Sequence, residues 1–261
     1  MNELHAKFES KGLSIVGVTY ENKKKTEPWI QRHGVEHPYA YDPGKKLQSW
    51  FGINGIPHAV LVDSFGTIVW RGHPAYLTDE MVESALLGAF QTPVHEWPAD
   101  AAPVVASLKL GDLPAALDSA RSSSAKIGST PVATLLEGRI KDVVGAVENA
   151  FDSGDLLTAS RRGASAAAVL GNLPEGRRVQ ELMKRLESEP KLQKALAEQR
   201  DAERELAKLL RQAGKVRRVS EAQEICDKLD EFAKRYAGTN LGADAAREAA
   251  GLRKRIKRST G

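Results

Sequence analysis

The sequence contains a single cysteine, Cys226, among its 261 residues. One cysteine cannot form an internal disulfide, so the chain has no disulfide framework. It has no Cys-x-x-Cys motif either, and therefore no catalytic residue for thiol–disulfide exchange, which needs an attacking thiolate. Because Ile225 and Leu229 lie nearby in the sequence, we expect Cys226 to be a buried structural residue.

Long apolar runs and common cofactor motifs are also absent. The apolar runs, such as Ala59–Val62, are short, whereas a membrane-spanning helix needs about 20 apolar residues. We therefore expect no membrane span in this chain. The chain has no Gly-x-Ser-x-Gly nucleophile motif and no glycine-rich phosphate loop of either common pattern. These absences argue against a serine hydrolase and against nucleotide binding of the usual kinds, and no cofactor is expected.

Histidines offer no convincing metal site. His33 and His37 are four residues apart, which suits two ligands on one helical face. Gly34 and Pro38 interrupt such a helix, so no metal site is expected. His58 follows a proline and is a candidate for touching a substrate, but packing within a strand is the favoured interpretation.

Charge divides the chain into two parts. Residues 1–97 hold 9 Lys+Arg and 11 Asp+Glu, whereas residues 98–261 hold 29 and 23. All 6 histidines and all 4 tryptophans lie in the first part. We expect domains at residues 1–92 and 101–261, with a proline-containing linker at 93–100. The basic run Arg253–Arg258 has no interleaved aromatic residue, so we interpret it as a solvated helix end and expect no nucleic-acid binding.

Residues 1–92 show an alternating pattern of helices and strands, which is typical of α/β layered folds. The sequence predicts a helix that Gly12 ends, a buried strand at 13–19 and a hairpin around the Asp63–Gly66 turn, where Asp63 is expected to cap the backbone. The remaining predicted elements are helices at 23–33, 46–51 and 78–90 and an extended segment at 39–41.

Residues 99–261 are predicted to be all helical. Two Gly-Asp-Leu triplets, at 111–113 and 154–156, lie 43 positions apart, within the range of helical repeats. In each, Gly can end one helix and Asp can cap the next. A weaker third unit spans about 220–256, and residues 191–210 form an amphipathic helix. We expect helical hairpins, with features of tetratricopeptide-like repeats.

The order and spacing of these pieces resemble the thioredoxin superfamily, in its TlpA-like and peroxiredoxin-like branch. The residues that carry the resemblance are Leu4, Phe8 and Gly12, Ile15–Thr19, Gly55-Ile56-Pro57, Val60–Asp63 and Gly66–Val69. The resemblance implies a cis bond before Pro57. It also implies that Ile56 offers its backbone to a bound substrate chain while Pro57 shapes the floor of the substrate-binding site. Geometry alone equally allows a trans proline at the start of a strand.

The chain departs from this family at the redox centre. The family carries Cys-x-x-Cys at the start of the first helix, where the helix dipole stabilises a thiolate. By this resemblance the motif and the central first strand lie upstream of Met1. The expected fold is thus an α/β thioredoxin-like domain lacking its first strand, followed by an all-α helical-hairpin domain. We interpret Met1 as an internal methionine of a longer natural protein, which makes this chain a fragment.

The resemblance implies a thiol–disulfide oxidoreductase of disulfide-reductase type that acts on protein thiols and disulfides. It also implies a location in the bacterial cell envelope. An alternative is a cysteine-free thioredoxin-like scaffold whose helical domain recruits a protein partner. A peroxiredoxin-like enzyme with a single upstream cysteine is a third option. Whether this chain takes part in an enzyme therefore depends on residues outside it.

Overall fold

The computed structural model describes residues 1–64, 66, 68–86, 88–216 and 218–260, without the side chains of residues 80 and 258–260. The chain forms two compact units, Met1–Asp142 and Val143–Gly261. None of the described helices is both long and apolar enough to cross a membrane.

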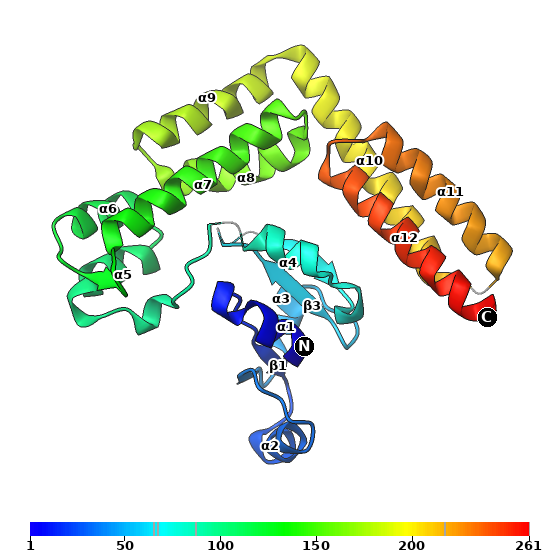
Figure 1. Ribbon diagram of the computed structural model, residues 1–261, viewed down its shortest axis with the longest axis horizontal. Coiled ribbons are helices and arrows are strands. Elements are labelled where there is room, and N and C mark those ends of the chain that lie inside the picture. Colours follow the sequence, from blue (N-terminus) through cyan, green and yellow to red (C-terminus); the bar gives the residue numbers. More distant parts are fainter. Residues whose placement is uncertain (65, 67, 87, 217, 261) are drawn as a thin grey trace. The chain divides into compact units, whose positions relative to one another are not determined.

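The first unit begins with short helices and two small sheets (Figure 1). The helix α1 continues as a 3-10 turn at Glu9–Lys11, and Gly12 ends it with a left-handed φ of 102°, as predicted. Strands β1 and β2 are parallel, and β3 and β4 form the predicted antiparallel hairpin. Phe65 and Thr67 of the hairpin turn lie outside the described residues. The elements are α1 (Asn2–Phe8), β1 (Gly17–Thr19), α2 (Lys23–Arg32), β2 (Tyr39–Tyr41), α3 (Lys46–Trp50), β3 (Ala59–Val62), β4 (Ile68–Gly72) and α4 (Asp79–Ala85).

Local sequence explains most of these boundaries. Asn22 caps α2 by accepting a hydrogen bond from the Lys25 N–H at 3.1 Å, and α2 continues through Pro28 to Arg32. Thr78 caps α4 in the same way, as the sequence predicts. Phe8 is fully buried, and a side chain of this size contributes about 3 kcal/mol through its burial.

The rest of the first unit is helical except for one small ladder. Strands β5 (Lys126–Ile127) and β6 (Thr130–Pro131) pair around a turn in which Gly128 has a φ of 58°. The prediction that no strand follows residue 99 is therefore wrong at this point, because two residues on each side of a glycine turn were too short a pattern to recognise. The helices are α5 (Ala102–Lys109), α6 (Leu113–Arg121) and the first part of α7 (Val132–Asp152).

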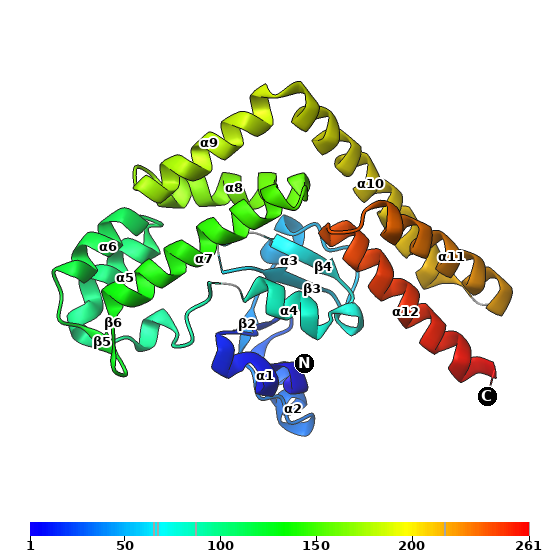
Figure 2. The same cartoon turned by 45° about the horizontal axis from the view of Figure 1, so that its top comes forward.

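The second unit is entirely helical among its described residues (Figure 2). Helices α11 and α12 run side by side as a hairpin in both views and pack with α10. One apolar cluster, which includes Leu206, Leu229 and Phe232, joins these helices to α8. The helices are the remainder of α7, α8 (Leu156–Leu170), α9 (Pro174–Ser188), α10 (Pro190–Lys215), α11 (Val219–Arg235) and α12 (Asn240–Thr260).

Both Gly-Asp-Leu triplets have the predicted local structure. Gly111 and Gly154 have φ values of 74° and 78°, and the following aspartates cap α6 and α8. The Asp112 carboxylate accepts from the Ala115 N–H at 3.0 Å. This result confirms the helix ends that the triplets predict. It leaves the interpretation of these helices as repeats a prediction.

Candidate functional site

The loop between α3 and β3 carries the two predicted substrate-binding residues. The Gln48 side chain donates to the Ile53 carbonyl oxygen at 3.2 Å, and the Ile53 N–H donates back to the Gln48 carbonyl at 3.0 Å. These bonds fold the start of the loop onto α3. Further along, the Ile56–Pro57 peptide bond is cis, which confirms the geometry that the resemblance implies.

Ile56 lies on the surface of this loop. The residue is 73% exposed. Among the described residues, no group hydrogen bonds to the backbone of Ile56, and β3 begins only at Ala59. An exposed peptide group next to the start of a strand can pair with an extended polypeptide. The role of Ile56 and Pro57 in substrate binding remains a prediction.

Strands β1 to β4 form two separate sheets, and this is the central feature of the candidate site. β1 pairs only with β2, and β3 only with β4, among the described residues. The Gly17 N–H donates to the Pro38 carbonyl at 2.8 Å, and the Thr19 carbonyl accepts from the Asp42 N–H at 2.7 Å. Because peptide groups alternate in direction along a strand, those of Val18 face the opposite, open edge.

The exposure of β1 corrects one expectation. The sequence predicts a buried strand at 13–19, but Val16 and Val18 are 54% and 52% exposed. The strand is also shorter than predicted, with only Gly17–Thr19 in the ladder. Its apolar residues were correctly interpreted as strand-forming. The prediction of burial fails because no other described segment covers Val16 and Val18.

The other candidate residues are dispersed. His33 stacks on Trp29 with ring centroids 4.4 Å apart, and its Nδ1–H donates to the Trp29 carbonyl at 2.8 Å. His37 instead packs edge-on against Tyr39. His58 is half-buried beside Pro57. The described residues contain no group of three or more His, Cys, Asp or Glu side chains placed to hold a metal ion.

The hairpin turn is braced by backbone contacts. The Asp63 carbonyl accepts from the Gly66 N–H at 3.1 Å, and the Ser64 N–H donates to the Ala85 carbonyl at 3.2 Å. The latter bond ties the turn to the end of α4. Asp63 therefore lies in a backbone-bonded turn. The expected capping role of its side chain stays a prediction.

Sequence reasoning missed Arg139 of α7, whose guanidinium reaches the same turn. It donates to the Ser64 carbonyl and lies 4.5 Å from the centre of the Phe90 ring. Burial lowers the pKa of Arg139, while the Asp63 carboxylate opposes this shift. No local pattern signals a contact between residues 75 positions apart.

Cys226 is buried, as predicted. Its side chain is fully inaccessible, and its Sγ–H donates weakly to the Ala249 carbonyl at 3.7 Å. Burial raises the pKa of this thiol, and Arg253 only partly offsets that effect. A thiol held in its neutral form away from solvent is a poor nucleophile.

The basic run at the end of the chain is partly neutralised within its own unit. Arg253 pairs with Asp230, and Arg255 donates to Glu248 at 2.9 Å. These contacts favour the interpretation of the run as a helix end.

The N-terminal part of the first unit is similar in sequence to known proteins. Residues 1–71 match the AhpC/TSA family. The chain is 30% identical over 70 residues to the thiol-disulfide oxidoreductase ResA of Bacillus thuringiensis. It is 27% identical over 84 residues to the protein of the same name from Halalkalibacterium halodurans. No solved structure matches the chain significantly.

These similarities cover only part of each protein. The first match spans 26% of this chain and 40% of the relative, and the second spans 32% and 47%. The chain thus spans less than half the length of the curated relatives it matches. The N-terminal part of the chain is redoxin-like, and thiol–disulfide chemistry is the activity named for its relatives.

Proposed function

We propose that residues 1–92 are the larger part of a thioredoxin-like domain of a thiol–disulfide oxidoreductase whose redox cysteines lie in residues preceding Met1 in the natural product. One observation carries this proposal: β1 and β3 belong to separate sheets and each has an open edge. Unpaired strand edges are costly in a native domain, and one added strand would satisfy both.

The missing segment would supply the thiol chemistry. One cysteine thiolate attacks a sulfur of the substrate disulfide, forming a mixed disulfide and releasing one substrate thiolate. The second cysteine thiolate then attacks the mixed disulfide, which releases the other substrate thiol and leaves the cysteine pair oxidised. Cys226 cannot take either part, because it is buried and its pKa is raised.

In this proposal the present chain holds the substrate polypeptide. The exposed peptide group of Ile56 pairs with an extended substrate segment, while the Pro57 ring shapes the adjoining surface. Substrates are protein thiols and disulfides, since the relatives are named thiol-disulfide oxidoreductases. The helical part, 101–261, serves as a second interaction module.

Disulfide reduction by the longer natural product tests the proposal. Replacing the first upstream cysteine with serine should abolish activity. Ile56→Pro removes the N–H that pairs with substrate and should lower kcat/KM about tenfold, whereas Ile56→Ala keeps the N–H and should have a smaller effect. Thermal unfolding of both variants checks that they fold. Equal activity of Ile56→Pro and wild type would contradict the binding role of Ile56.

One observation favours the alternative of a cysteine-free scaffold: residues 1–225 contain no cysteine at all. In that case the thioredoxin-like part binds polypeptides without chemistry and the helical part recruits a protein partner. A natural product that lacks upstream cysteines, yet still binds extended peptides in an Ile56-dependent manner, would establish the scaffold instead of the enzyme.

A further inference from the structure

Lysines gather at one edge of the β1–β2 sheet. Residues 1–97 contain nine Lys and Arg residues, and five of these follow directly after β1 or β2. Because the two strands are parallel, their carboxyl ends meet at the same edge. We call this surface the lysine edge and define it by Lys23, Lys24, Lys25, Lys45 and Lys46 with the aromatic residues Tyr20, Tyr41 and Trp50.

Contacts link the two halves of the lysine edge. The Lys45 ammonium lies 4.2 Å from the centre of the Tyr20 ring, so the segment after β2 touches the segment after β1. The Asp42 N–H also donates to the Thr19 carbonyl at 2.7 Å. These contacts join the two sequence segments that together contribute the five lysines.

Nearby carboxylates leave much of this positive charge available. Asp42 is buried, and its two carboxylate oxygens accept the backbone N–H groups of Lys46, Leu47 and Gln48 at 2.9–3.2 Å. Glu27 pairs with Lys23 at 3.3 Å. Among the described residues, no carboxylate lies within ion-pair distance of Lys24 or Lys46.

Exposed aromatic rings accompany these lysines. Trp50 is 75% exposed and lies one helical turn after Lys46 on α3, so the two share a face. Tyr20 and Tyr41 are 46% and 39% exposed. Exposed aromatic side chains are enriched at protein-binding surfaces, where the ring supplies buried area. Complementary charges around such a ring add selectivity.

We propose that the lysine edge binds an acidic segment of a partner polypeptide, with Trp50 as its apolar anchor. Charge complementarity identifies the partner chemistry, since ammonium groups without carboxylate partners attract Asp and Glu side chains. A nucleic acid is disfavoured, because residues 1–97 carry two more acidic than basic residues and a long polyanion would meet that repulsion. Binding of an acidic segment at the lysine edge does not depend on the proposed function. Only the identification of this partner as the substrate rests on it.

Peptide binding to the full chain tests the proposal. Three fluorescent probes are compared by anisotropy: an Asp/Glu-rich peptide with one Tyr, its Asn/Gln counterpart, and an oligothymidine of equal length. The acidic peptide should bind about tenfold more tightly than the neutral one, and its affinity should fall as salt rises. Equal affinity for the two peptides, or tighter binding of the oligothymidine, would overturn the proposal.

Matched variants locate the site. Lys24→Glu with Lys46→Glu should weaken binding of the acidic peptide about tenfold, and Trp50→Ala should weaken it several-fold. Arg71→Glu with Lys126→Glu makes the same charge change at exposed positions of the same unit outside the lysine edge, and should change affinity less than about twofold. Equal losses in the two double variants would contradict the assigned site.

A milder variant keeps the site testable if the Glu variant does not fold. Lys24→Gln with Lys46→Gln should weaken binding of the acidic peptide about threefold. Unchanged affinity of this variant would contradict the proposal. Because the assay involves no thiol, a natural product without redox cysteines would end the oxidoreductase proposal and leave this result standing. Conversely, a redox-active product that binds both peptides equally would end only the present inference.

Discussion

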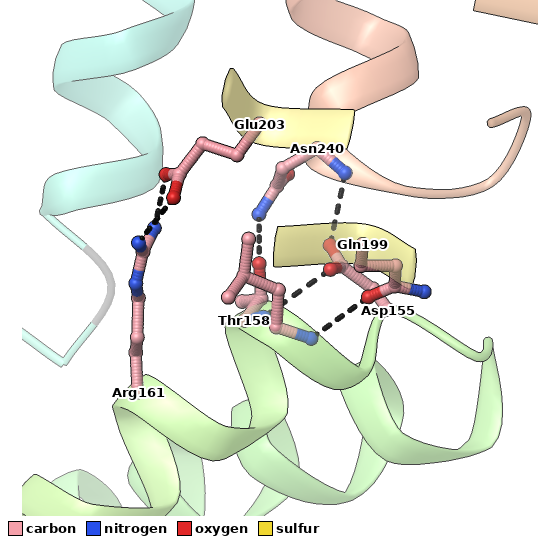
Figure 3. A network of polar contacts seen from close by, with 7 residues as sticks. Asp155, Thr158, Arg161, Gln199, Glu203 and Asn240 are labelled. Atoms are coloured by element: carbon pink, nitrogen blue, oxygen red, sulfur yellow. Dashed lines mark hydrogen bonds and ion pairs between the residues drawn. The ribbon is translucent and has the colours of Figure 1, made fainter. Parts of the chain in front are cut away.

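The carboxylate of Asp155 accepts a hydrogen bond from the backbone N–H of Asn240 at 2.9 Å, across 85 residues of sequence. The same carboxylate accepts from the Thr158 N–H at 3.3 Å, so one buried side chain holds the starts of α8 and α12 (Figure 3). The Gln199 side chain adds α10 to this junction by accepting from the Leu157 N–H at 2.8 Å.

Asp155→Ala should destabilise the second unit by about 2–3 kcal/mol, because it removes a helix cap and leaves the part-buried N–H of Asn240 without its acceptor. Asp112→Ala is the matched control, since Asp112 makes only the local cap to α6 and should cost about 1 kcal/mol. Urea unfolding followed by helical circular dichroism measures both. Equal losses would show that the bond to Asn240 contributes nothing.

Arg139→Ala should destabilise the first unit by about 2–3 kcal/mol, because the Ser64 carbonyl loses its donor and the Phe90 ring loses a packed neighbour. Arg121→Ala removes an exposed pair with Glu137 at 2.9 Å and should cost less than about 1 kcal/mol. Thermal unfolding compares the two variants. A larger effect at Arg121 would contradict the structural role of Arg139.

Cys226 should resist thiol reagents in the native protein and react at least about 100-fold faster in denaturant, because burial raises its pKa and blocks access. A raised pKa in the folded state favours the neutral thiol. The associated stability is therefore complete below the unfolded pKa of about 8.5 and is lost as pH rises through the folded value. Rapid labelling of native protein with a coloured disulfide reagent would disprove this account.

The first unit should lose stability as pH falls below about 6.5, because the pKa of His37 is lowered by burial and then by the nearby His5 and α-amino group, while Glu36 opposes them. A depressed folded pKa means that the stability is present above the unfolded pKa and is lost as pH falls through the folded value. His37→Gln should flatten this decline in thermal midpoint. His95→Gln, at a well-exposed site, should not. An unchanged decline in His37→Gln would remove His37 from the explanation.

Features that depend on neighbouring residues could be predicted from the sequence. The β3–β4 hairpin follows from two apolar segments on either side of a turn, and the helix ends at Gly111 and Gly154 follow from a glycine beside a capping aspartate. The cis bond at Ile56–Pro57 was expected from the family resemblance.

Features that depend on tertiary register could not be predicted in this way. The contacts of Arg139 with Ser64 and of Asp155 with Asn240 join residues far apart in the sequence. The lysine edge is likewise invisible until the parallel pairing of β1 and β2 brings Lys45 to Tyr20. The exposure of Val18 depends on what lies beside β1, which no pattern within the strand reveals.

The most direct test of the central claim is the intact mass and N-terminal sequence of the protein isolated from its own cells. The account predicts a longer product that contains a Cys-x-x-Cys segment ahead of Met1, with the Val18 N–H protected from hydrogen exchange by an added strand. A natural product that begins at Met1, or one whose upstream residues contain no cysteine, would contradict the oxidoreductase proposal and leave the scaffold in its place.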